Sequence, residues 1–137
     1  MSVINELIRG ESDGTISFGN YSLAEKSKLD CFEHAGDLYK VKTYQAITKL
    51  ERNGMFVYES VPGTAVNNFK ATGEEVSFQV EGLEDAQITL ELEAGTEYNI
   101  MIDGADAGVM KTNLGGKLNI SVEMDGSSAV TVKISKK

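Results

Sequence analysis

The chain has 137 residues, of which 41% are hydrophobic and 25% charged, so it can bury a core and fold as an ordered domain. Its net charge of −8 argues against nucleic-acid and anionic-membrane partners, because clustered Lys and Arg supply the affinity for both. The single cysteine excludes an internal disulfide. No run approaches the ~20 apolar residues that cross a bilayer, and no signal-peptide pattern is visible, so the sequence predicts a cytoplasmic protein.

The first 62 residues predict a small β lobe that is rich in aromatic side chains. Its short apolar runs are bounded by Asp-Gly, Gly-Asn and Ala-Gly-Asp turns, which is typical of strands. For the first run a short helix is the alternative, because periodicity alone does not separate the two structures in short apolar runs. The predicted strands cover residues 3–9, 15–18, 21–23 and 29–32.

The stretch from Tyr39 to Val61 predicts a hairpin. Asn53-Gly54 separates two runs of aromatic and β-branched residues, and both turn residues tolerate the positive φ of a type I′ turn. This register places Leu50 opposite Val57, with apolar side chains on both faces, so we expect a central hairpin that is covered on both sides. The alternative is a helix over Gln45 to Arg52 that ends at Asn53 and Gly54.

A substitution tests the turn. Gly54→Val is expected to lower stability more than Ser127→Val, because valine does not readily adopt positive φ.

Residues 63–137 predict an acidic, seven-stranded, antiparallel β-sandwich. Apolar and polar residues alternate in most runs, and turn signals such as Asp103-Gly104 separate them. The predicted fold is therefore all-β, with the 1–62 lobe packed on a C-terminal sandwich of the immunoglobulin or fibronectin kind. Whether the two parts, divided at Pro62-Gly63, share one core is open. The predicted strands cover 66–71, 76–80, 88–92, 98–102, 109–112, 118–124 and 130–134.

Residues 30–34 gather the only cysteine and the only histidine with two carboxylates. A nucleophilic Cys31–His34 pair is one interpretation, but residues three apart on a strand point to opposite faces. A zinc site needs more ligands than this pair supplies. We therefore predict a buried thiol followed by a surface turn.

Residues 103–108 carry two aspartates between glycines and are predicted to form a tight turn. A calcium loop is the alternative, but calcium needs more oxygen ligands than two aspartates supply. The sequence therefore predicts no metal and no cofactor.

The carboxylates of residues 74–97 are predicted to be solvated positions of alternating strands. A glycosidase needs two carboxylates that face each other across a cleft, and the spacing singles out no such pair. We therefore predict no catalytic residue. The carboxylates are Glu74, Glu75, Glu81, Glu84, Asp85, Glu91, Glu93 and Glu97.

Three tyrosines and two lysines form a candidate binding surface: Tyr39, Lys40, Lys42, Tyr44 and Tyr58. Tyrosine joins a large apolar body to a polar tip, which is why binding faces use it. On a regular strand Tyr39 and Tyr44 point to opposite faces, so at least one of them belongs to the core. The chain has no tryptophan for stacking on sugar rings.

Two resemblances bear on function. The hairpin pattern between Tyr98 and Val122 is similar to strands of small β-sandwich modules at the ends of polysaccharide-degrading enzymes. The runs KTYQAITKLERNGMFVYESVPGTAVNNF, ISFGNY and MKTNLGGKL resemble a family of short bacterial proteins called endosialidases, over nearly the whole chain. That resemblance implies an association with sialic-acid glycans, and it carries no catalytic residues onto this sequence.

These patterns favour a non-enzymatic interaction or structural module that binds a protein partner or itself. The sandwich pattern shows no catalytic constellation, and a part of 62 residues is marginal on its own. A glycan-binding module, or a remnant of a sialic-acid hydrolase, is the alternative. A structural subunit of a phage or an injection machine is a third hypothesis, and it would show as a defined ring or trimer.

Overall fold

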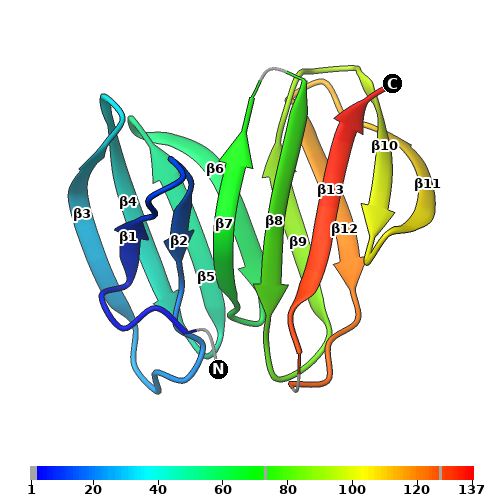
Figure 1. Ribbon diagram of the computed structural model, residues 1–137. Coiled ribbons are helices and arrows are strands. Elements are labelled where there is room, and N and C mark those ends of the chain that lie inside the picture. Colours follow the sequence, from blue (N-terminus) through cyan, green and yellow to red (C-terminus); the bar gives the residue numbers. More distant parts are fainter. Residues whose placement is uncertain (1–2, 73, 127) are drawn as a thin grey trace.

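The computed structural model describes residues 3–72, 74–126 and 128–137 as two antiparallel β-sheets packed face to face (Figure 1). The described residues contain no helix, which confirms the all-β prediction. They form thirteen strands. These are β1 (Ile8–Gly10), β2 (Ile16–Phe18), β3 (Ser27–His34), β4 (Asp37–Tyr44), β5 (Ile47–Arg52), β6 (Met55–Val61), β7 (Ala65–Ala71), β8 (Glu75–Glu81), β9 (Ala86–Glu91), β10 (Glu97–Ile102), β11 (Ala105–Lys111), β12 (Lys117–Val122) and β13 (Val130–Lys136).

Both sheets combine strands from the two sides of Pro62. The seven-stranded sheet has the order β1-β2-β7-β8-β13-β10-β11, and the six-stranded sheet has the order β12-β9-β6-β5-β4-β3. Buried residues from both sides of Pro62 belong to one hydrophobic cluster. The two parts of the chain therefore share one core. The immunoglobulin- or fibronectin-like assignment remains a prediction.

The hairpin of β5 and β6 forms at the predicted turn, where Asn53 and Gly54 have φ angles of 53° and 79°. It lies centrally in the six-stranded sheet, and the helix alternative is wrong. The predicted register is wrong beyond the turn, because an irregularity at Val57 places Leu50 opposite Tyr58. Only the face that carries these two residues is buried, so the expected cover on both sides is also wrong.

The N-terminal strand predictions are confirmed only in part. β1 begins at Ile8 rather than at residue 3, and residues 21–23 form a turn and an irregular segment instead of a strand. The short strand predicted at 29–32 is part of the longer β3. β2 is buried at every position, because it lies between β1 and β7 with the core beneath it.

An unpredicted turn at Gln45-Ala46 separates β4 from β5. Neither residue is a glycine and neither has positive φ, so the local sequence carries no strong turn signal. Distant segments hold the turn instead. The Gln45 N–H donates to the Leu23 carbonyl, and the Gln45 carbonyl accepts from the Gly63 N–H.

The C-terminal predictions are confirmed for the number of strands and for the turn at Asp103-Gly104. Seven strands, β7 to β13, follow Pro62, and Asp103-Gly104 forms the two-residue turn between β10 and β11. They do not make a sandwich of their own, because β9 and β12 pair into the sheet that β3 to β6 begin.

An aromatic cluster joins the two sheets at the centre of the core. The Tyr58 ring, from the six-stranded sheet, is fully buried and packs edge-on against Phe18 and Phe78, with ring centroids 5.3 and 5.7 Å away. Phe69 lies 5.7 Å from Phe18 and from Phe78. Edge-on aromatic pairs contribute beyond their buried area, so this cluster fastens one sheet to the other.

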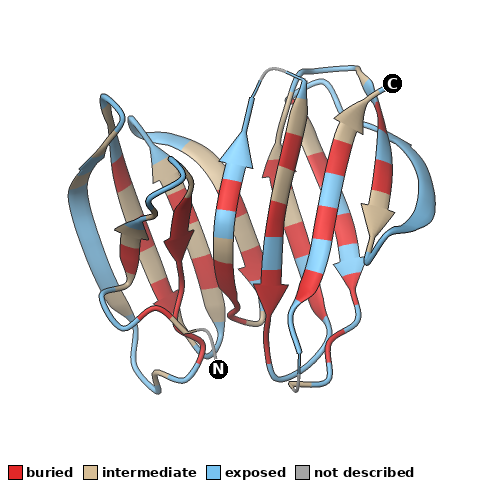
Figure 2. Cartoon of the chain, viewed as in Figure 1, coloured by how far each residue is buried: buried red, intermediate tan, exposed pale blue. Residues whose placement is uncertain are grey.

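One end of the sandwich is sealed by buried hydroxyl groups. The Thr64 hydroxyl oxygen lies 2.9 Å from the Tyr58 hydroxyl and 2.7 Å from the Ser60 hydroxyl. The Thr64 carbonyl accepts from the Thr48 hydroxyl at 2.8 Å, and Thr48 lies 2.8 Å from the Thr43 hydroxyl. Among the described residues, no buried side-chain nitrogen or oxygen lacks a partner. We call this the sealed end; it is the lower end in Figure 2, where β2, β7 and β8 are coloured as buried.

Candidate functional site

The opposite end of the sandwich is open, and a groove runs across it between the two sheets. Three adjoining hollows of about 200, 270 and 610 Å³ compose this groove. Arg52 and Ala71 line all three, so the hollows meet where β5 and β7 end. We call it the end groove; its lining includes Tyr39, Arg52, Val57, Phe69, Ala71, Val76, Leu92, Glu93 and Tyr98.

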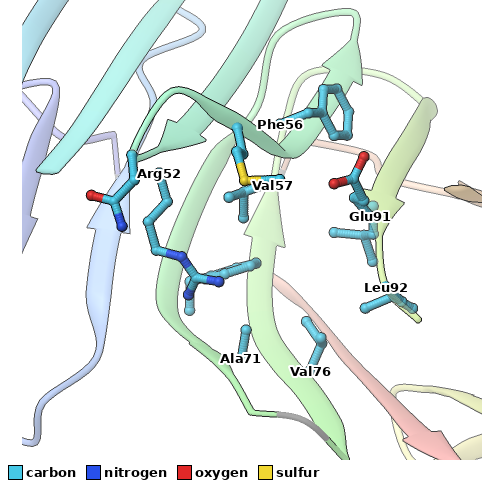
Figure 3. Close-up of a pocket in the computed structure, with 11 residues that line it drawn as sticks. Arg52, Phe56, Val57, Ala71, Val76, Glu91 and Leu92 are labelled. Carbon is cyan, nitrogen blue, oxygen red and sulfur yellow. The ribbon is translucent and has the colours of Figure 1, made fainter. Parts of the chain in front are cut away.

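Arg52 occupies the middle of the end groove because of its position on β5. Thr48 and Leu50 point into the core, and the alternation of a strand places Arg52 on the same side, one step beyond the last core residue. Figure 3 shows its side chain reaching from the end of β5 toward Ala71. No ion pair or hydrogen bond joins its guanidinium to any residue that the structure describes.

The floor of the groove is apolar. Val57 comes from β6, Phe69 from β7, Val76 from β8 and Leu90 from β9, so both sheets contribute to it. Phe69, Val76 and Leu90 also belong to the hydrophobic core, which makes the floor a continuation of the core surface. An aliphatic side chain placed there is removed from water, and each Å² of apolar surface so buried contributes about 25 cal/mol.

Carboxylates from the second half of the chain converge on the rim of the groove, and three of them are ion-paired with lysines. Glu91 lies 2.7 Å from the Lys117 ammonium, Glu75 lies 3.6 Å from that of Lys133, and Glu93 pairs with Lys136. The hydrogen bond from Lys136 to Glu93 raises the pKa of the ammonium group. These pairs neutralise three of the rim carboxylates, and the Arg52 cation lies above the floor without an ion pair to any described residue.

The prediction that the carboxylates are solvated is wrong for Glu81 and is confirmed for the five that are exposed, Glu74, Glu84, Asp85, Glu93 and Glu97. Glu74, Glu75, Glu91 and Glu93 all line the hollow beside Tyr98, because the ends of β8 and β9 meet there. Glu81 is buried, with 5% of its surface exposed.

The predicted binding surface is divided between the two faces of the six-stranded sheet. Tyr39 and Tyr58 are buried in the core, so they are unavailable to a partner as a flat surface. Lys40, Lys42 and Tyr44 alternate with the core residues of β4 and lie together on the outward face, half-buried. The structure thus separates the tyrosine pair from the lysine pair and keeps only Tyr44 beside the lysines.

Cys31 and His34, for which the sequence predicts a buried thiol and a surface turn, are not joined by any hydrogen bond in the structure. Cys31 is exposed at an irregularity in β3 with a φ of 58°, so its predicted burial is wrong. His34 Nε2 lies 3.0 Å from the Gly14 carbonyl oxygen, and its ring packs edge-on against Tyr39. No group of His, Cys, Asp and Glu within 3–72, 74–126 and 128–137 is arranged to hold a metal ion.

Sequence reasoning missed Arg52 as a site residue. The residue directly precedes the Asn53-Gly54 turn. Charged residues are common beside hairpin turns, so an arginine there does not indicate a site. Arg52 comes two residues after Leu50, so it points to the same face of the strand. This position could have identified it, because an inward-pointing residue beyond the last core residue lies at the open end of a sandwich. The partners across the groove come from β7, β8 and β9, and only the sheet order brings them there.

Comparison with known proteins gave no match: no family model fits the sequence, and no characterised protein or solved structure is similar to it. In the part of the chain that the structure describes, no helix has the length and apolar character needed to span a membrane.

Proposed function

We propose that this chain is a non-enzymatic, cytoplasmic interaction module that binds an extended segment of a partner protein in the end groove. The unpaired Arg52 guanidinium above an apolar floor is the observation that carries the proposal. A segment with an acidic side chain next to an aliphatic one satisfies both features. The guanidinium receives the carboxylate through paired N–H donors, and the floor receives the aliphatic group.

The dimensions of the groove also suit a short extended segment. Its wall on the six-stranded sheet passes the ends of β4, β5, β6 and β9. Neighbouring strands lie about 4.8 Å apart, so this wall spans on the order of 14 Å, the length of about four extended residues.

The test is a titration with the tripeptide acetyl-Leu-Glu-Leu-amide, with acetyl-Leu-Gln-Leu-amide as the matched ligand. We expect Arg52→Gln to weaken binding of the glutamate peptide about tenfold, because hydrogen bonds to charged groups contribute about 1.5–3 kcal/mol. The matched control variant is Arg9→Gln, since Arg9 is the other arginine of the chain and lies on β1, paired with Glu6 and Glu11.

Equal loss of affinity in the two arginine variants contradicts a specific role for Arg52. Equal binding of the glutamate and glutamine peptides to the wild-type chain contradicts carboxylate recognition. Binding that is lost only in Arg52→Gln and only for the glutamate peptide supports the proposal.

A glycan ligand is the second candidate, in line with the resemblance to endosialidases. It is favoured by the rim, where carboxylates such as Glu74 and Glu93 can accept hydrogen bonds from sugar hydroxyls while Arg52 receives an acidic sugar. N-acetylneuraminic acid is the probe. If it binds in the groove and the tripeptide does not, the protein-partner proposal is wrong and the glycan candidate replaces it.

Light scattering coupled to size exclusion separates the two forms of the protein-partner proposal. A dimer or larger assembly that persists at all concentrations identifies a second copy of this chain as the partner. A monomer at every concentration excludes self-binding and leaves a different protein as the partner.

A further inference from the structure

A row of lysines crosses the outward face of the six-stranded sheet. Lys28 on β3 lies directly opposite Lys42 on β4, and Lys42 lies directly opposite Lys49 on β5. Lys40 lies on the same face, two residues before Lys42 on β4. These four lysines and Glu51 line a shallow hollow of about 80 Å³. We call the four lysines the lysine patch.

The lysine patch works against the stability of the sheet. Side chains that face each other across antiparallel strands are about 5 Å apart at Cβ, and like charges in such pairs are destabilising. The chain has 21 acidic and 13 basic residues, so it has carboxylates in excess with which to separate its lysines. It nevertheless places three lysines side by side on three adjacent strands.

The charge of the patch is poorly compensated by the protein itself. Lys49 lies 3.6 Å from Glu51, which is the carboxylate of the hollow. Lys28, Lys40 and Lys42 form no ion pair with any residue in the described ranges. Lys40 and Lys42 are half-buried, so their stems lie along the sheet and hold their charges near the hollow. Two carboxylates lie opposite the patch, Glu51 across from Lys40 and Glu59 across from Lys49, so the four cations exceed the carboxylates that face them.

We infer that the lysine patch binds a multivalent oxyanion, namely a phosphate or sulfate group. A lysine ammonium is a compact charge with rotatable donors, which suits a tetrahedral anion, whereas the planar fork of arginine suits a carboxylate. The shallow hollow lies among the four lysines, so an anion seated there can meet more than one ammonium group.

This site is separate from the end groove. The lysines project from the outward face of β3, β4 and β5, whereas Arg52 points between the sheets from the inward side of β5. The inference consequently does not rest on the proposed function, and Arg52→Gln is expected to leave oxyanion binding within twofold of wild type.

The test is calorimetric titration with inorganic phosphate at fixed ionic strength, repeated with inorganic sulfate and with glycerol phosphate. We expect Lys42→Gln to weaken binding about fivefold, because removing one exposed charge partner costs up to about 1 kcal/mol. The matched control is Lys133→Gln on the seven-stranded sheet, a lysine already paired with Glu75, which is expected to change the affinity less than twofold.

A second readout guards against a misfolded variant. Without phosphate, Lys42→Gln should raise the melting temperature, because it removes the repulsion of Lys42 with Lys28 and with Lys49, whereas Lys133→Gln should not. Saturating phosphate should raise the melting temperature of the wild type more than that of Lys42→Gln.

The outcomes divide clearly. Tighter binding of glycerol phosphate than of inorganic phosphate supports the site and identifies a phosphate ester as the ligand. Tighter binding of inorganic phosphate also supports the site and identifies the free ion as the ligand. Equal affinities in Lys42→Gln and Lys133→Gln overturn the inference. An identical rise in melting temperature with sodium chloride at the same ionic strength also overturns it, because it shows general screening rather than binding.

Discussion

The polar side chains at the two ends of the sandwich differ in whether they are hydrogen-bonded within the protein. At the sealed end, Thr43, Thr48, Ser60 and Thr64 are fully buried, and each finds a hydrogen-bond partner within the protein. At the open end, the Arg52 guanidinium has no partner among the described residues and lies over an apolar floor. The difference teaches where to look for binding: polar groups that are bonded within the core hold the fold, whereas an exposed guanidinium without a protein partner is available to a ligand.

One turn glycine from each end shows a similar contrast. At the sealed end, a Cβ on Gly63 would overlap the carbonyl oxygen of Tyr44, so the chain passes too closely there for any side chain. At the open end, a Cβ on Gly54 would meet no atom within 4 Å. The chain at Gly63 is therefore packed against a neighbouring backbone, whereas the turn at Gly54 is open to solvent.

The largest expected effect is that of Tyr58→Ala. The substitution removes a fully buried ring from the aromatic cluster and a hydroxyl from the sealed end. We expect a loss of about 3–5 kcal/mol in the free energy of unfolding, from lost burial and from the cavity. Urea denaturation of the variant measures it, and a loss below about 1 kcal/mol would show that the cluster does not join the sheets.

Gly63→Ala comes next and compares the two ends directly. The new methyl group must displace the Tyr44 carbonyl, and overpacking of this kind costs up to about 3 kcal/mol. Gly54→Ala adds only the strain of positive φ, about 1–2 kcal/mol. Thermal melts of both variants provide the measurement, and a greater loss in Gly54→Ala would contradict the contrast between the ends. Ser127, the comparison position offered by the sequence, lies outside the described residues.

Acid should loosen the open end first. Glu11 lies in the β1–β2 connection and accepts hydrogen bonds from the Ser17 hydroxyl at 2.5 Å and from Arg9 at 3.0 Å. These bonds lower the pKa of its carboxyl group below the ordinary 4.5, with the Ser17 bond the larger cause. The stability that the carboxylate contributes is therefore present above pH 4.5 and is lost as the pH falls through the lower, folded-state pKa.

Glu11→Gln tests this dependence. The stability difference between wild type and variant should be constant near neutral pH and shrink as the pH falls below about 4.5. Melting temperatures across pH 3 to 7 provide the measurement. The hydroxyl network of the sealed end holds no group that ionises in this range, so Thr64→Val should give a difference that does not vary with pH. A pH-independent Glu11→Gln difference would contradict the assignment.

The smallest expected effect on stability is that of Arg52→Gln. Its side chain makes no described ion pair or hydrogen bond, so the free energy of unfolding should change by less than about 0.5 kcal/mol. Urea denaturation beside the titrations provides the measurement. A loss above about 1 kcal/mol would give Arg52 a structural role and would remove the basis for a binding role.

Local turn chemistry made much of the fold predictable. Asn53-Gly54 and Asp103-Gly104 were identifiable because each needs positive φ at two successive residues, which few residue pairs tolerate. The turn at Gln45-Ala46 was not, because contacts with Leu23 and Gly63 hold it in place of local preference. A missed turn changes which strands pair, so the row of Lys28, Lys42 and Lys49 was also hidden.

The end groove was less predictable than the strands, for a physical reason. Alternation along a strand assigns a residue to a face, but it does not say which strands become neighbours. Regular pairing from the turn would place Tyr58 on the face opposite to Leu50. The irregularity at Val57 instead places it directly across from Leu50, inside the core. Arg52 and Glu93 are far apart in sequence and meet only because both sheets end at the same side of the sandwich.

The most direct test of the central claim is an amide NMR titration of the wild-type chain with acetyl-Leu-Glu-Leu-amide. If the open end is the binding end, the amides of Val57, Ala71 and Leu92 shift, whereas those of Thr48 and Thr64 stay in place. Shifts at the sealed end, or at Lys42 and its neighbours alone, would contradict the account. So would a spectrum that the peptide leaves unchanged.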